Sequence, residues 1–167
     1  MRCGPRWTPT GCDDPALMII PDVNVLVYAY RREAELHDRY AGWLNRIVAG
    51  ADELALPETV LTGFVRIVTN PRILATPAPT DDALGFVEVL RSGSRAHPCP
   101  ATDTTWSRFS TLVAADRQIR GNLVPDAWIA ALAASHGGTV ATADRGFARF
   151  GVPWFDPAVD LPGQRNG

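Results

Sequence analysis

The sequence predicts an α/β fold with a small central parallel sheet flanked by helices. Short apolar runs alternate along the chain with longer stretches of helical periodicity, a pattern typical of a parallel sheet. Hydrophobic residues make up 46% of the 167 residues and charged residues 20%, which indicates a folded chain and not a disordered one. We predict one domain, residues 18–155, between a disordered extension, residues 1–17, and a loose tail, residues 156–167.

The first half of the chain is predicted to form two strands and three helices. Residues 17–20 are a continuous apolar run, typical of a buried parallel strand. Residues 23–30 are predicted as a short helix that depends on tertiary packing, because its β-branched residues are poor helix formers. Residues 37–48 place apolar side chains on one helical face. Residues 53–56 are then predicted as a strand and residues 58–69 as an amphipathic helix.

The next segment is predicted to alternate in the same way. Thr80 is expected to cap a helix that continues to residue 90. Residues 96–100 are predicted as a weak strand at an edge of the sheet, since two prolines remove hydrogen-bond donors. Residues 102–119 are predicted as a further helix, and residues 152–155 as the last short strand.

The stretch 123–150 is the most informative part of the sequence. A helix is predicted to open at Pro125–Asp126 and to stay apolar on nearly every face as far as Ser135, which indicates a buried helix. Two glycines then end the helix, and residues 139–142 form a β-branched strand. Asp144 follows this strand directly. The start of the helix and the end of the strand should therefore lie at the same edge of the sheet.

Three carboxylates are predicted to meet at that edge. Asp22 follows the first strand, and right-handed crossovers bring the carboxyl ends of all parallel strands to one side, where Asp126 and Asp144 also lie. Carboxylates that converge repel one another, and a hard divalent cation relieves that repulsion. Oxygen ligands without nearby His or Cys favour Mg²⁺, with Mn²⁺ as the alternative. Such a site is suited to the hydrolysis of a phosphodiester.

Composition excludes several other classes. All 16 basic residues are arginine, so the chain lacks the lysine of a P-loop, of a Schiff base or of a phosphoaspartate receiver. The net charge of −2 indicates no general nucleic-acid field. The cysteines are three and lack C-x-x-C spacing, which fits a reducing, cytoplasmic location. The sequence contains no membrane span and no signal peptide in residues 1–17, and Met18 is a plausible start.

Four blocks of the sequence resemble the PIN-domain ribonucleases, and in particular the VapC toxins of type II toxin–antitoxin pairs. The blocks are MIIPDVNVLVYAY, FVRIVTNPRIL, RGNLVPDAWIAALAASHG and TVATADRGFARF, which together extend over most of the chain. The resemblance implies a PIN-like fold and a Mg²⁺-dependent endoribonuclease that cuts structured RNA such as tRNA or rRNA. It also implies a cognate VapB-type antitoxin as partner, and a homodimer.

The resemblance assigns roles to individual residues. Asp22, Asp126 and Asp144 match the family's catalytic, metal-binding aspartates, the last of them within the element Thr142-Ala-Asp144-Arg-Gly-Phe147. Asn24 occupies the small polar position two residues after Asp22. Thr142 is expected to orient Asp144 or a metal-bound water without contacting the metal itself.

One position departs from the family pattern. Many PIN domains carry a glutamate shortly before an arginine on the helix after the second strand, and here that position is Gly63, before Arg66. Glu58 lies five residues earlier, about 140° around the helix, so it is expected to face elsewhere. The departure leaves open a second hypothesis, a catalytically weak or inactive PIN scaffold that binds RNA or a protein.

Simpler interpretations exist for several of these residues. Taken alone, Asp126 is explained as a partner of a helix dipole, Asp144 as a turn residue and Asn24 as a helix cap; the shared sheet edge is what favours a site. Arg120 and Arg145 are predicted to contact RNA phosphates, with solvated surface as the alternative. Two tryptophans, Trp43 and Trp106, are expected to lie in the core.

Overall fold

The computed structural model describes residues 17–160 and confirms the α/β prediction. Within them the chain forms a parallel five-stranded sheet of order β3-β2-β1-β4-β5, so the first strand is central. Every connection between paired strands is therefore a crossover, as expected where helices separate the strands. The strands are β1 (Met18–Pro21), β2 (Glu53–Leu56), β3 (Ala96–Pro98), β4 (Thr139–Ala141) and β5 (Trp154–Phe155).

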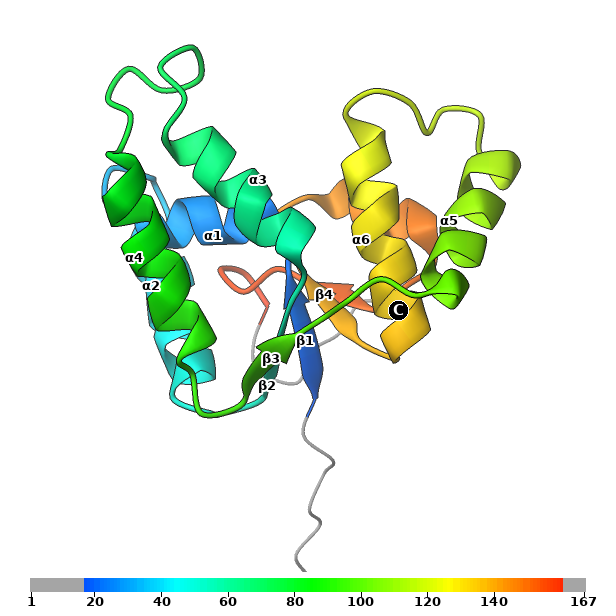
Figure 1. Cartoon of the computed structure of the whole chain (residues 1–167), viewed down its shortest axis with the longest axis horizontal. Coiled ribbons are helices and arrows are strands. Elements are labelled where there is room, and N and C mark those ends of the chain that lie inside the picture. Colours follow the sequence, from blue (N-terminus) through cyan, green and yellow to red (C-terminus); the bar gives the residue numbers. More distant parts are fainter. Residues whose placement is uncertain (1–16, 161–167) are drawn as a thin grey trace, which may run out of the picture.

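The helices gather at two flanks of the sheet. Figure 1 shows α1 to α4 at one flank and α5 and α6 at the other, with the strands between them. The two groups of helices contribute different residues to the edge of the sheet, since Asp22 caps α1 and Asp126 lies in α6. The helices are α1 (Val23–Tyr30), α2 (His37–Val48), α3 (Glu58–Val68), α4 (Thr80–Arg91), α5 (Asp103–Ala115), α6 (Leu123–His136) and the 3-10 helix η1 (Arg145–Phe150).

The ends of some elements differ from the prediction. Helix α5 ends at Ala115, four residues before the expected end, and the buried Ile119 lies in the following loop. Helix α6 begins at Leu123, two residues before Pro125. Thr80 is the first residue of α4 and makes no capping hydrogen bond, so the predicted cap is wrong. These differences are local and leave the order of elements unchanged.

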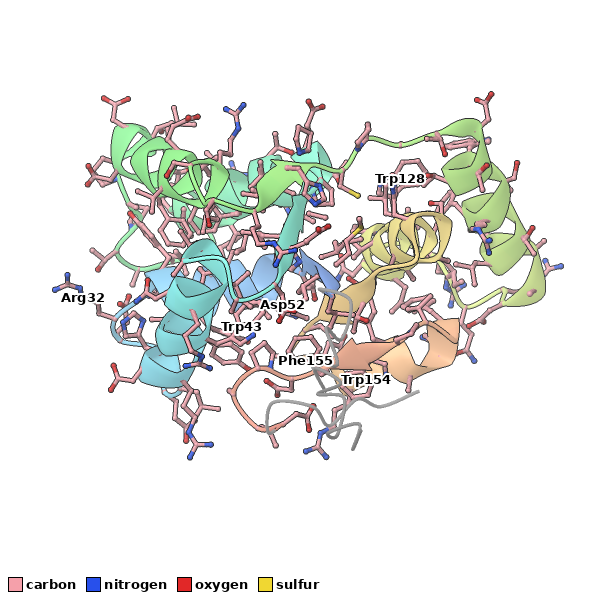
Figure 2. The ribbon with its side chains drawn as sticks, turned by 90° about the horizontal axis from the view of Figure 1, so that it is seen from below. Arg32, Trp43, Asp52, Trp128, Trp154 and Phe155 are labelled. Atoms are coloured by element: carbon pink, nitrogen blue, oxygen red, sulfur yellow. The ribbon has the colours of Figure 1, made fainter. Side chains whose placement is uncertain are left out.

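The core lies on both sides of the central strands. Ile20, Leu54 and Val140, one from each of β1, β2 and β4, have no exposed surface. Helix α6 is alanine-rich on its buried sides, which lets its backbone approach the sheet closely. Helix α2 also packs against the last strand, where Trp43 contacts Phe155 of β5 with ring centroids 6.0 Å apart (Figure 2).

The segment after the last strand is packed as far as the structure describes it. Tyr40 donates a hydrogen bond of 2.9 Å to the Asp156 carboxylate, and Ala158 is 5% exposed. Residues 156–160 therefore are not loose, contrary to the prediction. The remainder of the expected tail and the extension up to residue 16 lie outside the described residues. Between residues 17 and 160, no helix has the length and apolar character needed to cross a membrane.

Candidate active site

The site lies at the carboxyl ends of β1 and β4, two neighbouring strands. Pro21 of β1 pairs with Ala141 of β4, and the Asp22 amide donates to the Ala141 carbonyl at 2.8 Å. Asp22 and Thr142, the residues that follow these two strands, consequently lie side by side. Both side chains are buried, at 4% and 0% exposure.

Asp22 is held by hydrogen bonds to both of its carboxylate oxygens. Oδ1 accepts from the Val23 amide at 2.6 Å, so Asp22 is the N-cap of α1. Oδ2 accepts from the Thr142 hydroxyl at 2.8 Å and from the Asn24 side-chain amide at 2.7 Å. Burial raises the pKa of Asp22, and these hydrogen bonds act against that rise by stabilising the charged form. The carboxylate orientation is therefore fixed by three donors.

Asn24 connects the first strand to the fourth. Its side-chain amide donates to Thr142 Oγ1 at 3.3 Å as well as to Asp22, and its Oδ1 accepts from the Ala143 amide at 3.2 Å. Thr142 Oγ1 in turn accepts from the Asp144 amide at 3.0 Å. Asn24 is therefore not the cap of α1, and Thr142 orients the Asp144 backbone as well as Asp22.

Asp144 lies at the start of η1 and is exposed. Its Oδ1 accepts a hydrogen bond from the Gly146 amide at 2.7 Å. Asp144 therefore also has the turn-forming role that was the alternative to a metal site. A β-carbon at position 146 would lie 2.9 Å from this same oxygen, so a larger residue there would displace the Asp144 carboxylate. This bond leaves Oδ2 of Asp144 without a hydrogen bond within the described residues.

Asp126 differs from the other two aspartates because it has no hydrogen-bond or ion-pair partner within residues 17–160. It lies in the first turn of α6 and is partly buried. Burial, and then the negative charges of Asp22 and Asp144, raise the pKa of Asp126 to about 6. The charge of Asp144 also raises the pKa of Asp22. The structure therefore brings the three aspartates close enough to repel one another.

The chemistry of the three side chains suits a hard divalent cation. Their donor atoms are all carboxylate oxygens, and no cation acts on Asp22 or Asp126. Yet no group of three or more His, Cys, Asp or Glu side chains in residues 17–160 is arranged to hold a metal ion. Mg²⁺ commonly keeps several waters and binds through one or two carboxylates, which agrees with both observations.

The position of the missing acid lies beside the site. A β-carbon at Gly63 of α3 would meet Val23 Cγ2 at 3.1 Å, and Val23 directly follows Asp22. Glu58 is exposed at the start of α3, and its charge is not among those that act on Asp22 or Asp126. Glu58 therefore does not substitute for an acid at position 63, as its angle around the helix predicts.

The remaining predicted residues have mixed outcomes. Arg120 and Arg145 are exposed and have no ion-pair partner within residues 17–160, so each is available to an external anion. Trp43 is 6% exposed, which confirms its core position. Trp106 is 61% exposed and packs on Phe109 and Trp128, so its core assignment is wrong. Two surface grooves of about 510 and 580 Å³ flank η1, and neither contains a site aspartate.

Arg149 joins η1, which begins after Asp144, to the loop that leads into α6 and Asp126. The sequence does not reveal this contact. Arg149 of η1 donates to Gln118 Oε1 at 2.8 Å and lies 3.4 Å from Asp116 Oδ2, both in the loop before α6. Spacing of residues along the sequence offers no signal for it, because its partners are about thirty positions away.

Comparison of the sequence with known protein families identifies the family of this chain. The family model described as "PIN domain" matches residues 19–153. The chain belongs to the PIN-domain family. Among its PIN-domain relatives is the VapC ribonuclease Mb2897 of Mycobacterium bovis, which is 41% identical over 133 residues, 80% of this chain and 90% of the relative. Ribonuclease VapC25 of Mycobacterium tuberculosis is 35% identical over 136 residues, 80% and 93% of the two chains.

Solved structures share the PIN fold at lower identity. The structure of FitAB bound to an IR36 DNA fragment aligns with a TM-score of 0.64 and 22% identity, and covers 88% of this chain and all of that one. VapBC2 from Rickettsia felis, bound to a DNA fragment from its promoter, aligns with a TM-score of 0.60 and 19% identity, over 80% and 93% of the two chains. At these identities the likeness establishes the fold of the PIN domain and not its activity.

Proposed function

We propose that this PIN-domain protein is a Mg²⁺-dependent endoribonuclease of the VapC type, which hydrolyses phosphodiester bonds in structured RNA such as tRNA or rRNA. The single observation that carries the proposal is the set of mutually repelling aspartates at the sheet edge, with Asp126 unpaired. Relatives at 34–41% identity that are named as VapC ribonucleases support the same reaction.

Each residue of the site has a separate task in this proposal. Asp22, Asp126 and Asp144 would hold the ion, partly through water, and Mn²⁺ would substitute for Mg²⁺. When bound, such an ion lowers the pKa of a water and stabilises negative charge on a phosphate. Asn24 and Thr142 keep Asp22 in place, while Arg120 and Arg145 bind phosphates of the RNA backbone.

Asp126→Asn is the sharpest test of the reaction. Asp22 and Asp144 also accept structural hydrogen bonds, whereas Asp126 accepts none within the described residues, so this change removes a charge without removing a bond. We expect RNA cleavage to fall by at least about 100-fold, because loss of a group outside the metal's own ligands already costs 10–100-fold. Retained Mg²⁺-dependent cleavage in the variant would contradict the proposal, and EDTA should abolish cleavage by the wild type.

A cognate partner belongs to the same proposal. Two similar solved structures are those of VapBC2 from Rickettsia felis and VapBC-1 from nontypeable Haemophilus influenzae, and we propose that a VapB-type antitoxin inhibits this chain by covering its site. Titration of the purified partner into a cleavage reaction should stop cleavage at a fixed stoichiometry. The homodimer stays a prediction from the resemblance, and light scattering of the free protein tests it.

A second candidate function is a PIN scaffold that binds RNA or protein without cutting. Two observations favour it: the glycine at position 63, and the lack of a three-carboxylate metal group within residues 17–160. Parallel measurement of Mn²⁺ binding and RNA cleavage separates the two functions. Metal uptake without cleavage supports the scaffold, and metal-dependent cleavage that Asp126→Asn abolishes rejects it.

A further inference from the structure

The chain segments that carry Asp126 and Asp144 are not joined by a strand pairing. Asp126 belongs to the first turn of α6, which follows the loop of residues 116–122, whereas Asp144 begins η1. Helix α6 has no side-chain cap at Asn122, so its first turn depends on the preceding loop for support. The negative charges of the two aspartates meanwhile repel one another. Their separation is set by the packing of α6 on β4 and η1 and by contacts between η1 and the loop before α6.

Arg149 supplies such a contact. Its Nη2 donates to Gln118 Oε1 at 2.8 Å, and its Nε lies 3.4 Å from Asp116 Oδ2. The guanidinium is planar and rigid, so two acceptors on one loop fix its orientation as well as its distance. Asp116 also accepts from the Gln118 amide at 2.9 Å, which organises the loop at the point where Arg149 holds it.

Both ends of this link are anchored in the core. Ile119, one residue after Gln118, is 6% exposed, and Phe150, one residue after Arg149, is 6% exposed. Phe147 of η1 is fully buried. Because both segments are held rigidly beside the link, a displacement of the loop relative to η1 would also move the start of α6 relative to Asp144.

We propose that Arg149 is a positioning residue, which holds the loop of residues 116–122 against η1 and so sets the separation of Asp126 and Asp144 for a divalent cation. The inference rests on the proposed metal-dependent site. Arg149 touches neither the aspartates nor the reacting atoms in this role; it acts through the two segments that it joins. Metal affinity should then depend on Arg149 even though it is not a ligand.

Mn²⁺ binding by the full-length protein, measured from the free-ion EPR signal, tests the link. We expect Arg149→Gln to weaken Mn²⁺ binding roughly 5-fold, the effect that corresponds to one partly exposed ion pair. Gln118→Ala should weaken it by a similar factor, and the two changes together by little more than either alone. Hydrogen exchange should accelerate in the first turn of α6 and in η1 of both variants.

Arg95→Gln is the matched control. Arg95 pairs with Glu53 at 3.2 Å and with similar exposure, but at the amino ends of β2 and β3, at the opposite edge of the sheet from the aspartates. The Mn²⁺ affinity of the Arg95→Gln variant should stay within about twofold of wild type, because the Arg95–Glu53 pair is remote from the site.

The possible results distinguish this inference from the proposed function. Weaker Mn²⁺ binding in Arg149→Gln, with cleavage restored by excess metal, supports the link. Unchanged Mn²⁺ affinity with a raised KM for RNA would show that Arg149 binds substrate, and would overturn the link while leaving the nuclease proposal intact. Failure of the wild type to bind Mn²⁺ would overturn both. If Arg149→Gln fails to fold, Gln118→Ala decides the question alone.

Discussion

The three aspartates of the candidate site have different structural roles, although the sequence predicts the same role for all of them. Asp22 caps α1 and receives three hydrogen bonds, and Asp144 caps η1. Asp126 has no such duty within the described residues, and its pKa is raised to about 6. A titratable residue with a shifted pKa and no structural partner is a candidate for a functional role. Asp126 is therefore the residue at which function and stability are most clearly in conflict.

Stability should record this conflict in the metal-free protein. The folded-state pKa of Asp126, about 6, lies above its ordinary value of 3.8. The folded state therefore binds this proton more tightly than the unfolded state, and charged Asp126 destabilises the fold fully above pH 6 and not at all below about pH 4. Asp126→Asn should raise the free energy of unfolding at pH 7.5 by about 1 kcal/mol, discounted for solvent screening.

Urea unfolding of both proteins at several pH values measures this effect. The gain should disappear as the pH falls from 7.5 to 4, because the wild-type carboxyl becomes protonated there. Asp81→Asn, at an exposed first-turn position of α4, should instead lose a few tenths of a kcal/mol near neutral pH, since it only weakens a helix-dipole interaction. An equal gain in both variants would contradict the assigned repulsion.

Topology explains why the positions of the three aspartates are predictable. Asp22 and Asp144 follow from the rule that parallel strands end at one edge, and Asp126 from the start of the helix that leads into β4; neither step needs knowledge of side-chain contacts. Trp106 could not be assigned in the same way, because helical periodicity shows which residues share a face but not whether another element covers it. Its 61% exposure reflects the position of α5 at the outside of the molecule.

Helix α6 illustrates how local signals locate an element. Its C-terminal end is fixed by Gly137, which adopts the left-handed conformation with φ 67°, as the His-Gly-Gly sequence predicts. Its N-terminal end is less well determined, since no side chain caps it and it begins two residues before Pro125. The early end of α5 has a similar origin: Asp116 leaves the helical conformation although the apolar pattern continues to Ile119. Helix boundaries without a capping signal depend on tertiary contacts.

Two glycines provide a matched pair for testing this reading of α6. Gly137 and the exposed Gly85 of α4 both have open space where a β-carbon would lie, but only Gly137 of the two has a positive φ. Gly137→Ala should lower the free energy of unfolding by about 1 kcal/mol, the cost of a left-handed alanine. Gly85→Ala should raise it by roughly 0.5–1 kcal/mol, because alanine is the better helix former. Thermal and urea unfolding check the opposite signs, and a gain at position 137 would contradict a left-handed cap.

At the scale of the whole molecule, the three aspartates lie at one edge of the sheet that separates the two flanks. Asp22 lies between the central strand β1 and helix α1, which it caps, while Asp126 and Asp144 belong to α6 and to the start of η1. Mutual repulsion of these charges opposes the assembly of the edge in the absence of a cation. A ligand that binds the folded state alone stabilises it by mass action. Metal binding should thus be visible in the stability of the entire fold.

Thermal unfolding with Mg²⁺ or EDTA tests this consequence. At a Mg²⁺ concentration of about 100 times Kd, folding should gain about 2.7 kcal/mol, or a Tm increase of roughly 5–10 °C for a chain of this size. The increase should be larger at pH 8 than at pH 5.5, because protons compete with the metal for Asp126. Asp126→Asn should lose most of it, whereas Arg95→Gln should keep it. An increase of the same size in Asp126→Asn, or one that NaCl at equal ionic strength reproduces, would show that the cation acts on the protein surface in general and not on the sheet edge.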